Sequence, residues 1–227
     1  MFRELLTIFR SKDVLAEMGE NFARMLQLAH EMTLSAGAVF FGKKISQQER
    51  DRLFQQDIRV NQSERSIRKQ VVAHLSIQGN RLDVPYCLLL MSLVKDVERL
   101  GDYAKNILEL ADFGPNQFPD DEAVRELQSI RQDVEALFTA ALEILSSSES
   151  DQALRLIREG REIAQRSDDL IESVARAHYD TSTTTALVLG TRYYKRIGGH
   201  VLNVISSVVM PLHKVDYFDE DAIQFRP

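Results

Sequence analysis

The sequence has little cysteine, proline and glycine, and no tryptophan. Its 227 residues include 10 glycines, 5 prolines and a single cysteine, Cys87. One cysteine cannot build a disulfide framework, and it fits a reducing compartment. Basic residues are also a minority, with 28 Lys and Arg against 34 Asp and Glu and a net charge of -6. This acidic balance argues against a nucleic-acid-binding protein, which usually carries a basic stripe.

Long hydrophobic runs are missing as well. A helix that spans a bilayer needs about 20 apolar residues, and the longest candidate, Val201 to Leu212, is interrupted by Asn203 and two serines. Residues 1–10 lack the long apolar region and the cleavage site of a signal peptide. We therefore expect a soluble cytoplasmic protein. We expect residues 1–10 to form a short helix that closes one end of the fold, with docking on a partner or a membrane surface as the alternative.

Apolar side chains recur at alternating steps of three and four residues along most of the chain. This spacing places them on one stripe of a helix, and no segment shows the sustained alternation typical of a strand. Helices of about 30 residues are about 45 Å long, so they must lie along one another to cover their stripes. The stripes run over residues 15–39, 53–71, 90–111, 127–144, 151–179 and 187–208.

Local signals mark several helix ends in the first half. Ser46 and Glu49 have the spacing of a capping box, which starts the second helix. That helix runs toward Gly79-Asn80, a dipeptide typical of turns. Asp83 can cap the third helix, and Pro85 is tolerated in its first turn.

A thirteen-residue segment occurs twice, at residues 95–107 and 192–204. At this offset of 97 residues an Arg, a Gly and an Asn recur identically, and apolar positions stay apolar, which indicates a duplicated domain. We predict an all-α fold of two tandem antiparallel three-helix bundles with two smaller cores. The first bundle, with its N-terminal extension, covers residues 1–113. A linker (114–119), a second, degenerate bundle (120–212) and an acidic tail (213–227) follow.

The first copy of the repeat carries an acidic pair. Glu98 and Asp102 are four residues apart, so they share one helix face. If the preceding hairpin has its midpoint at 79.5, Asp57 and Asn61 lie level with this pair. Three carboxylates and an amide oxygen suit a hard cation such as magnesium, manganese or iron, and Asn106 could add a ligand. The alternative is that these acids are solvated and pair with basic neighbours, for which Arg99, Arg59 and Lys105 are candidates.

The second half carries the opposite charge at the matching positions. Lys195 and Gly199 stand where the first copy has Glu98 and Asp102. The histidines at 74 and 178 align at an offset of 104, which puts Arg161 and Gln165 in place of Asp57 and Asn61. Arg161 would then face Gly199, and Gln165 would face Lys195. Such a cluster cannot hold a cation, and we expect a structural salt-bridge role, with anion binding as the alternative.

Motifs for catalysis are missing from the sequence. None of the five histidines follows a Glu by three residues, which argues against a di-iron bundle enzyme. There is no P-loop, dinucleotide fingerprint or nucleophile elbow. We therefore expect a protein that is not an enzyme.

Residues 96–107, Asp-Val-Glu-Arg-Leu-Gly-Asp-Tyr-Ala-Lys-Asn-Ile, resemble a motif of the PhoU family of phosphate-uptake regulators. The motif typically reads Asp-Leu-Glu-Arg-Ile-Gly-Asp-His-Ala-Val-Asn-Ile, and the resemblance covers roughly residues 11–212. It implies two tandem three-helix bundles that bind metal through Glu98, Asp102 and Asp57. Asn61 joins them where the family usually has Asp. The second repeat departs further from the metal-binding pattern.

The resemblance also implies a function. Proteins of this family are cytoplasmic, non-enzymatic negative regulators that act on a phosphate ABC transporter and a sensor histidine kinase, often as homodimers. A PhoU-like protein would associate with the membrane only through these partners, and its client could be another ion transporter. The alternatives are a structural helical adaptor without metal and, as a weaker one, a metal-dependent enzyme.

Overall fold

The structure is a computed structural model that describes residues 14–147 and 149–215. These residues form six α-helices and two short 3-10 turns, and they contain no strand, which confirms the all-α prediction. The predicted helix in residues 1–10 and most of the predicted acidic tail lie outside the described residues. The elements are α2 (Val14–Phe40), α3 (Gln47–Leu75), η1 (Asn80–Asp83), α4 (Val84–Leu110), α5 (Glu122–Ser147), α6 (Ser150–Arg176), α7 (Thr181–Val209) and η2 (Leu212–Lys214).

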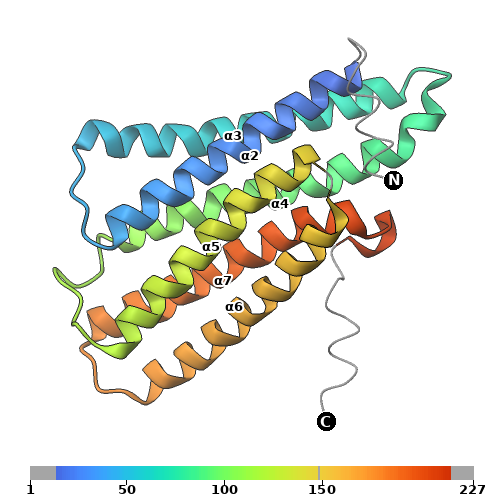
Figure 1. The fold of residues 1–227 in the computed structure, drawn as a ribbon. Coiled ribbons are helices and arrows are strands. Elements are labelled where there is room, and N and C mark those ends of the chain that lie inside the picture. Colours follow the sequence, from blue (N-terminus) through green and yellow to red (C-terminus); the bar gives the residue numbers. More distant parts are fainter. Residues whose placement is uncertain (1–13, 148, 216–227) are drawn as a thin grey trace.

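The helices are arranged as two antiparallel three-helix bundles. In the first bundle α2, α3 and α4 pack on one another, and in the second α5, α6 and α7 do the same. Helices α3 and α6 lie at opposite outer edges of the molecule, with the other four helices between them (Figure 1). The predicted order of helices within each half is therefore correct.

The two bundles also pack against each other along much of their length. Helix α4 packs on α7, and α2 contacts α5 (Figure 1). The buried apolar side chains of both halves consequently form one continuous cluster. Our expectation of two separate cores is wrong, because α4 and α7 bury apolar side chains between the bundles as well as within them.

The helix-end signals of the first half are mostly confirmed. The Ser46 hydroxyl accepts from the Glu49 backbone N–H at 3.2 Å, and the Glu49 carboxylate accepts from the Ser46 N–H at 2.8 Å. Gly79 has a φ of +111°, a backbone conformation that residues with a Cβ rarely adopt. Asp83 occupies the cap position of α4 but caps nothing. Its carboxylate accepts instead from His74 Nε2 at 2.8 Å, which ties the hairpin tip together.

The fifth predicted helix is three residues too long. Helix α6 ends at Arg176, residues 178–180 are not helical, and Asp180 has an extended backbone. The reason is Asp180, whose side chain accepts from the Thr183 N–H at 3.0 Å and caps α7, so the residues before it must leave the helix. Within the described part of the chain, no helix is both long and apolar enough to cross a bilayer.

Candidate cation site and its counterpart in the second bundle

The predicted cation ligands lie where α3 and α4 approach closely. Gly101 permits this approach, because a Cβ built at that position would lie 3.2 Å from Val60 Cγ1 on α3. Glu98 and Asp102 flank Gly101 in sequence, and Asp57 and Asn61 flank Val60. The helix contact therefore brings the two predicted pairs to the same part of the hairpin.

The register of the hairpin differs from the prediction by two to three residues of α4. Val60 contacts Gly101, and Asp57 contacts Lys105, so the midpoints of these pairs lie at 80.5 and 81 rather than at 79.5. The 3-10 turn η1, Asn80–Asp83, extends the tip beyond Gly79-Asn80 and accounts for the shift. As a result Asp57 is closest to Lys105, one turn beyond Asp102.

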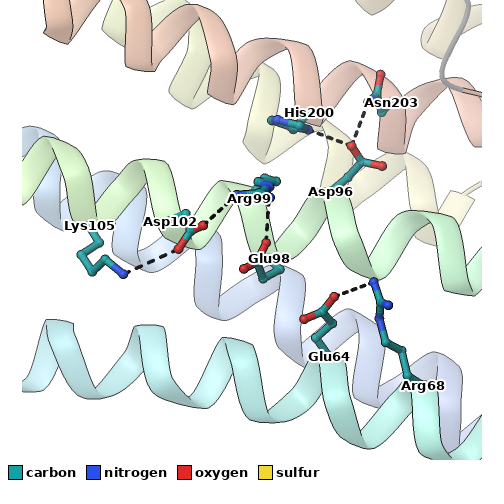
Figure 2. Close-up of polar contacts among 9 residues, drawn as sticks. All are labelled: Glu64, Arg68, Asp96, Glu98, Arg99, Asp102, Lys105, His200 and Asn203. Carbon is teal, nitrogen blue, oxygen red and sulfur yellow. Dashed lines mark hydrogen bonds and ion pairs between the residues drawn. The ribbon is translucent and has the colours of Figure 1, made fainter.

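Acidic and basic side chains alternate along this face of α4. Lys105 Nζ lies 3.0 Å from Asp57 Oδ2 and 3.6 Å from Asp102 Oδ1. Arg99 Nη1 lies 3.2 Å from Asp102 Oδ2, and Arg99 Nε lies 3.7 Å from Glu98 Oε2. Figure 2 shows Lys105, Asp102, Arg99 and Glu98 following one another along the helix. Two cations of the chain thus neutralise part of the acidic charge.

The ion pairs agree in part with the alternative prediction, in which the acidic side chains pair with basic neighbours. Arg99 and Lys105 were both expected as partners of these acids, and both make ion pairs with them. Arg59 makes no ion pair in the part of the chain that the structure describes. Lys105 occupies a position where the family motif quoted above typically has Val, so this cation is a departure of this chain from that motif.

Glu98 is the least compensated of the carboxylates. Its side chain is 21% exposed. Burial raises its pKa first of all, and the negative charges of Asp102, Glu64 and Asp57 raise it further, against the lowering effect of Arg99. A raised carboxyl pKa means that ionised Glu98 is held at a free-energy cost. A bound cation would relieve that cost.

Glu64 belongs to this acidic group although the sequence analysis did not select it. It pairs with Arg68 at 2.8 Å on α3 (Figure 2), and its charge reaches Glu98. The signal was present in the spacing: Glu64 follows Asp57 by seven residues, two helical turns, and so shares its face. Glu64 does not lie level with the acidic pair, which is the criterion that selected Asp57 and Asn61.

Two buried oxygens bear on whether the residues fit a cation. Asp57 is only 6% exposed, and its Oδ1 has no hydrogen-bond partner among the described residues; the same is true of Asn61 Oδ1. Buried oxygens without donors are oxygen ligands of the type that hard cations prefer. Within residues 14–147 and 149–215, however, no three His, Cys, Asp or Glu side chains already converge as a ligand set. The donor chemistry fits a cation, and Lys105 carries the positive charge beside Asp57.

The pKa of Lys105 reflects this position. Burial lowers it, but the hydrogen bond to Asp57 and the charges of Asp57 and Asp102 outweigh burial, and the pKa is raised overall. Lys105 therefore remains an ammonium ion. A metal ion at Asp57 and Asp102 would have to compete with it.

Asp96 links the two bundles, and the sequence analysis assigned it no role. It is 1% exposed and points away from the acidic face toward α7 (Figure 2). His200 Nδ1 and Asn203 Nδ2 each donate to Asp96 Oδ1 at 2.8 Å. The ring of His200 also stacks on Tyr103, with centroids 5.7 Å apart. A buried carboxylate with two donors from the other bundle fixes how α4 sits on α7.

The matching positions of the second bundle surround a basic groove. Arg161 of α6 and Lys195 and Gly199 of α7 all line it, as the repeat arithmetic predicts. Lys195 makes an ion pair with Asp168 of α6. The predicted pairing of Arg161 with Gly199 would put residue 158 level with Leu202, but Gly160 lies against Leu202. The register of this hairpin is therefore shifted in the same sense as that of the first.

The sequence of the first bundle matches a known family. Residues 22–111 match the family model described as PhoU domain. The resemblance drawn from residues 96–107 is thereby confirmed. No curated protein matches the sequence significantly.

Two solved PhoU structures share the fold over nearly their whole length. The phosphate transport system regulatory protein PhoU from Streptococcus pneumoniae superposes with a TM-score of 0.72 at 17% identity, covering 89% of this chain and 94% of the other. PhoU from Pseudomonas aeruginosa gives a TM-score of 0.64 at 20% identity, covering 94% and 99%. At these identities the likeness concerns the fold, and it extends the PhoU architecture to the second bundle.

Proposed function

We propose that this protein is a cytoplasmic regulator of phosphate transport and signalling that acts by contact and not by catalysis. The observation that carries the proposal is the match of residues 22–111 to the PhoU domain model, in a two-bundle fold that covers 94% of a phosphate transport system regulatory protein. The surfaces that would meet a partner are long, rigid helix faces. The proposed partners are components of a phosphate ABC transporter, or of another ion transporter, and a sensor histidine kinase.

The proposed regulator associates with the membrane only through these partners and acts as a homodimer. Its net charge of -6 gives no support to nucleic acid as a partner. A membrane-bound client fits a chain whose described helices include none that could span a bilayer.

As part of this function we propose a cation held by Glu98, Asp102, Asp57 and Asn61. Iron, magnesium and manganese are the candidates, because all four donors are oxygens. Support comes from the buried oxygens of Asp57 and Asn61 that have no donor among the described residues, and from the raised pKa of Glu98. The bound cation would supply positive charge that holds α3 and α4 together. Asp57 and Asp102 would have to exchange Lys105 for it.

A second candidate is a regulator that needs no metal. The observation in its favour is Lys105, whose ammonium group already lies within 4.0 Å of both Asp57 and Asp102. In this version the chain carries its own cation, and the acidic face is a permanently neutralised part of the hairpin. A metal-dependent enzyme is the weakest candidate, because the sequence carries no recognisable motif for a catalytic base or nucleophile.

The test is a binding measurement with purified partners. The full chain is titrated calorimetrically into the detergent-solubilised phosphate transporter of the same organism and, separately, into the cytoplasmic part of its phosphate-sensing kinase. Saturable binding to at least one of them is expected. Binding to neither, by a chain that circular dichroism shows to be folded, contradicts the proposed function.

A further inference from the structure

A groove of about 390 Å³ lies between α6 and α7 in the second bundle. Its walls carry the basic side chains Arg161, Arg192, Lys195 and Arg196, together with His200, and Gly199 lies among them. No Asp or Glu is among its lining residues. The groove therefore concentrates positive charge in a chain whose net charge is -6.

The basic residues of α7 share one face. Arg192 precedes Lys195 by three residues and Arg196 by four, and Gly199 follows both at the same spacings, which aligns these positions along the helix. Like charges at this spacing repel one another and destabilise an isolated helix. A groove built in this way requires solvation or a counter-charge.

The protein itself supplies only part of that counter-charge. Lys195 makes an ion pair with Asp168. Within the part of the chain that the structure describes, no carboxylate lies within 4.0 Å of a basic nitrogen of Arg192 or Arg196. His200 is held by Asp96, on the side where the two bundles meet. Two arginine side chains thus project beside the groove without an acidic partner.

The groove has open space beside Gly199. A Cβ built at Gly199 would meet no heavy atom within 4 Å. Gly160 has a different role, because a Cβ there would come within 2.6 Å of Leu202, so this glycine allows α6 and α7 to approach. The volume exceeds the roughly 30 Å³ of one water molecule many times and can hold a hydrated tetrahedral anion.

We propose that this groove is a binding site for phosphate-bearing anions, with Arg192 and Arg196 as the principal ligands. Arginine presents its donors in a planar fork that matches the oxygens of a phosphate group, and such charge-assisted hydrogen bonds are stronger than neutral ones. Two sources share this chemistry, free orthophosphate and the headgroup of an anionic lipid.

The groove is the counterpart of the acidic group in the first bundle. Lys195 and Gly199 stand 97 residues after Glu98 and Asp102, at corresponding places on α7 and α4. The two bundles therefore present opposite charge at equivalent positions, one suited to cations and the other to anions. The inference rests on this groove alone and is independent of the proposed function.

The test has one arm for each source. In the first, orthophosphate is titrated into the full chain in a phosphate-free buffer of low ionic strength and followed by calorimetry. In the second, the chain is floated with vesicles of phosphatidylglycerol, with phosphatidylcholine vesicles as the neutral reference. The groove variant is Arg192→Ala/Arg196→Ala. The matched control, Arg24→Ala/Arg155→Ala, removes the same charge from exposed positions that do not line the groove.

Saturable orthophosphate binding is expected, and the groove variant should bind about tenfold more weakly or worse while the control binds like wild type. Binding to anionic vesicles alone, with the same pattern of variants, assigns the groove to a lipid headgroup. A second variant, Gly199→Asp, places a carboxylate in the open space without removing a cation. It should also lose phosphate binding, because the carboxylate repels the anion. No binding in either arm, or equal binding by the groove and control variants, overturns the proposal.

Discussion

Removal of the Lys105 ammonium group should destabilise the first bundle measurably. In Lys105→Met the side chain keeps most of its apolar stem, and Asp57 and Asp102 lose their shared cation. Breaking a fully buried ion pair from one side costs about 3–5 kcal/mol, whereas an exposed pair contributes about 1 kcal/mol at most. Asp57 is 6% exposed and the Lys105 side chain 27%, so this pair lies between the two limits. We expect a loss of about 2 kcal/mol.

Urea denaturation in the presence of a chelator measures this loss, and thermal denaturation should show a fall in Tm of about 4–8 °C for a chain of this size. The control is Lys95→Met on the same helix, because Lys95 is exposed and its substitution removes the same charge. Equal stability of the two variants would refute the idea that Lys105 neutralises a costly acidic group.

The same variant tests whether a metal ion can take the place of the ammonium group. Without Lys105, a cation meets less competition at Asp57 and Asp102, and a ligand that binds only the folded state stabilises it by mass action. Added magnesium or manganese should therefore raise the Tm of Lys105→Met more than that of wild type. If magnesium, manganese and iron all fail to restore stability to Lys105→Met, the regulator that needs no metal is the better description.

Three further predictions concern carboxylates of α4. Glu98→Gln should stabilise the metal-free protein by about 0.5–1 kcal/mol at neutral pH. The pKa of Glu98 is raised in the folded protein, so ionised Glu98 lowers the free energy of unfolding at any pH above the ordinary carboxyl pKa. Urea denaturation at a series of pH values should therefore show that the stability gained by Glu98→Gln vanishes near pH 4. A gain in stability that does not depend on pH would contradict this. Glu98→Ala/Asp102→Ala should abolish metal binding, since the matching positions of the second bundle form a basic groove. Elemental analysis after purification without chelator measures the metal content. Undiminished metal content in this variant would rule out Glu98 and Asp102 as metal ligands. Asp96→Ala should cost about 1–3 kcal/mol in urea denaturation, because two half-buried donors on α7, those of His200 and Asn203, lose their acceptor. The exposed Glu159→Ala should cost little.

Most of the fold could be predicted from the sequence because its signals are local. Steps of three and four between apolar residues specify helices wherever they occur, and Ser46 with Glu49 specifies a helix start through groups three residues apart. The repeat at an offset of 97 residues indicated that the helix order of the first bundle recurs in the second. The single core could not be predicted in this way, because nothing in the periodicity distinguishes a face of α4 that packs within its own bundle from one that packs on α7.

The candidate site shows where such reasoning ends. The sequence selected Glu98, Asp102, Asp57 and Asn61 by placing them level on a hairpin, and the structure does bring Asp57 and Asp102 around one nitrogen, that of Lys105. The shift in register of two to three residues arises from η1, a 3-10 turn whose length no local signal gave. The tip is also fixed by a contact between His74 and Asp83, whereas the sequence analysis assigned Asp83 to a cap.

Phosphate uptake by cells that lack the gene tests the regulatory function most directly. The wild-type strain, the deletion strain and the deletion strain carrying the full chain on a plasmid are grown with ample phosphate, and uptake of labelled phosphate is measured together with phosphate-starvation transcripts. A negative regulator of the PhoU type predicts that uptake and transcripts stay high in the deletion strain and return to wild-type levels on complementation. Uptake and transcripts at wild-type levels in the deletion strain would contradict it.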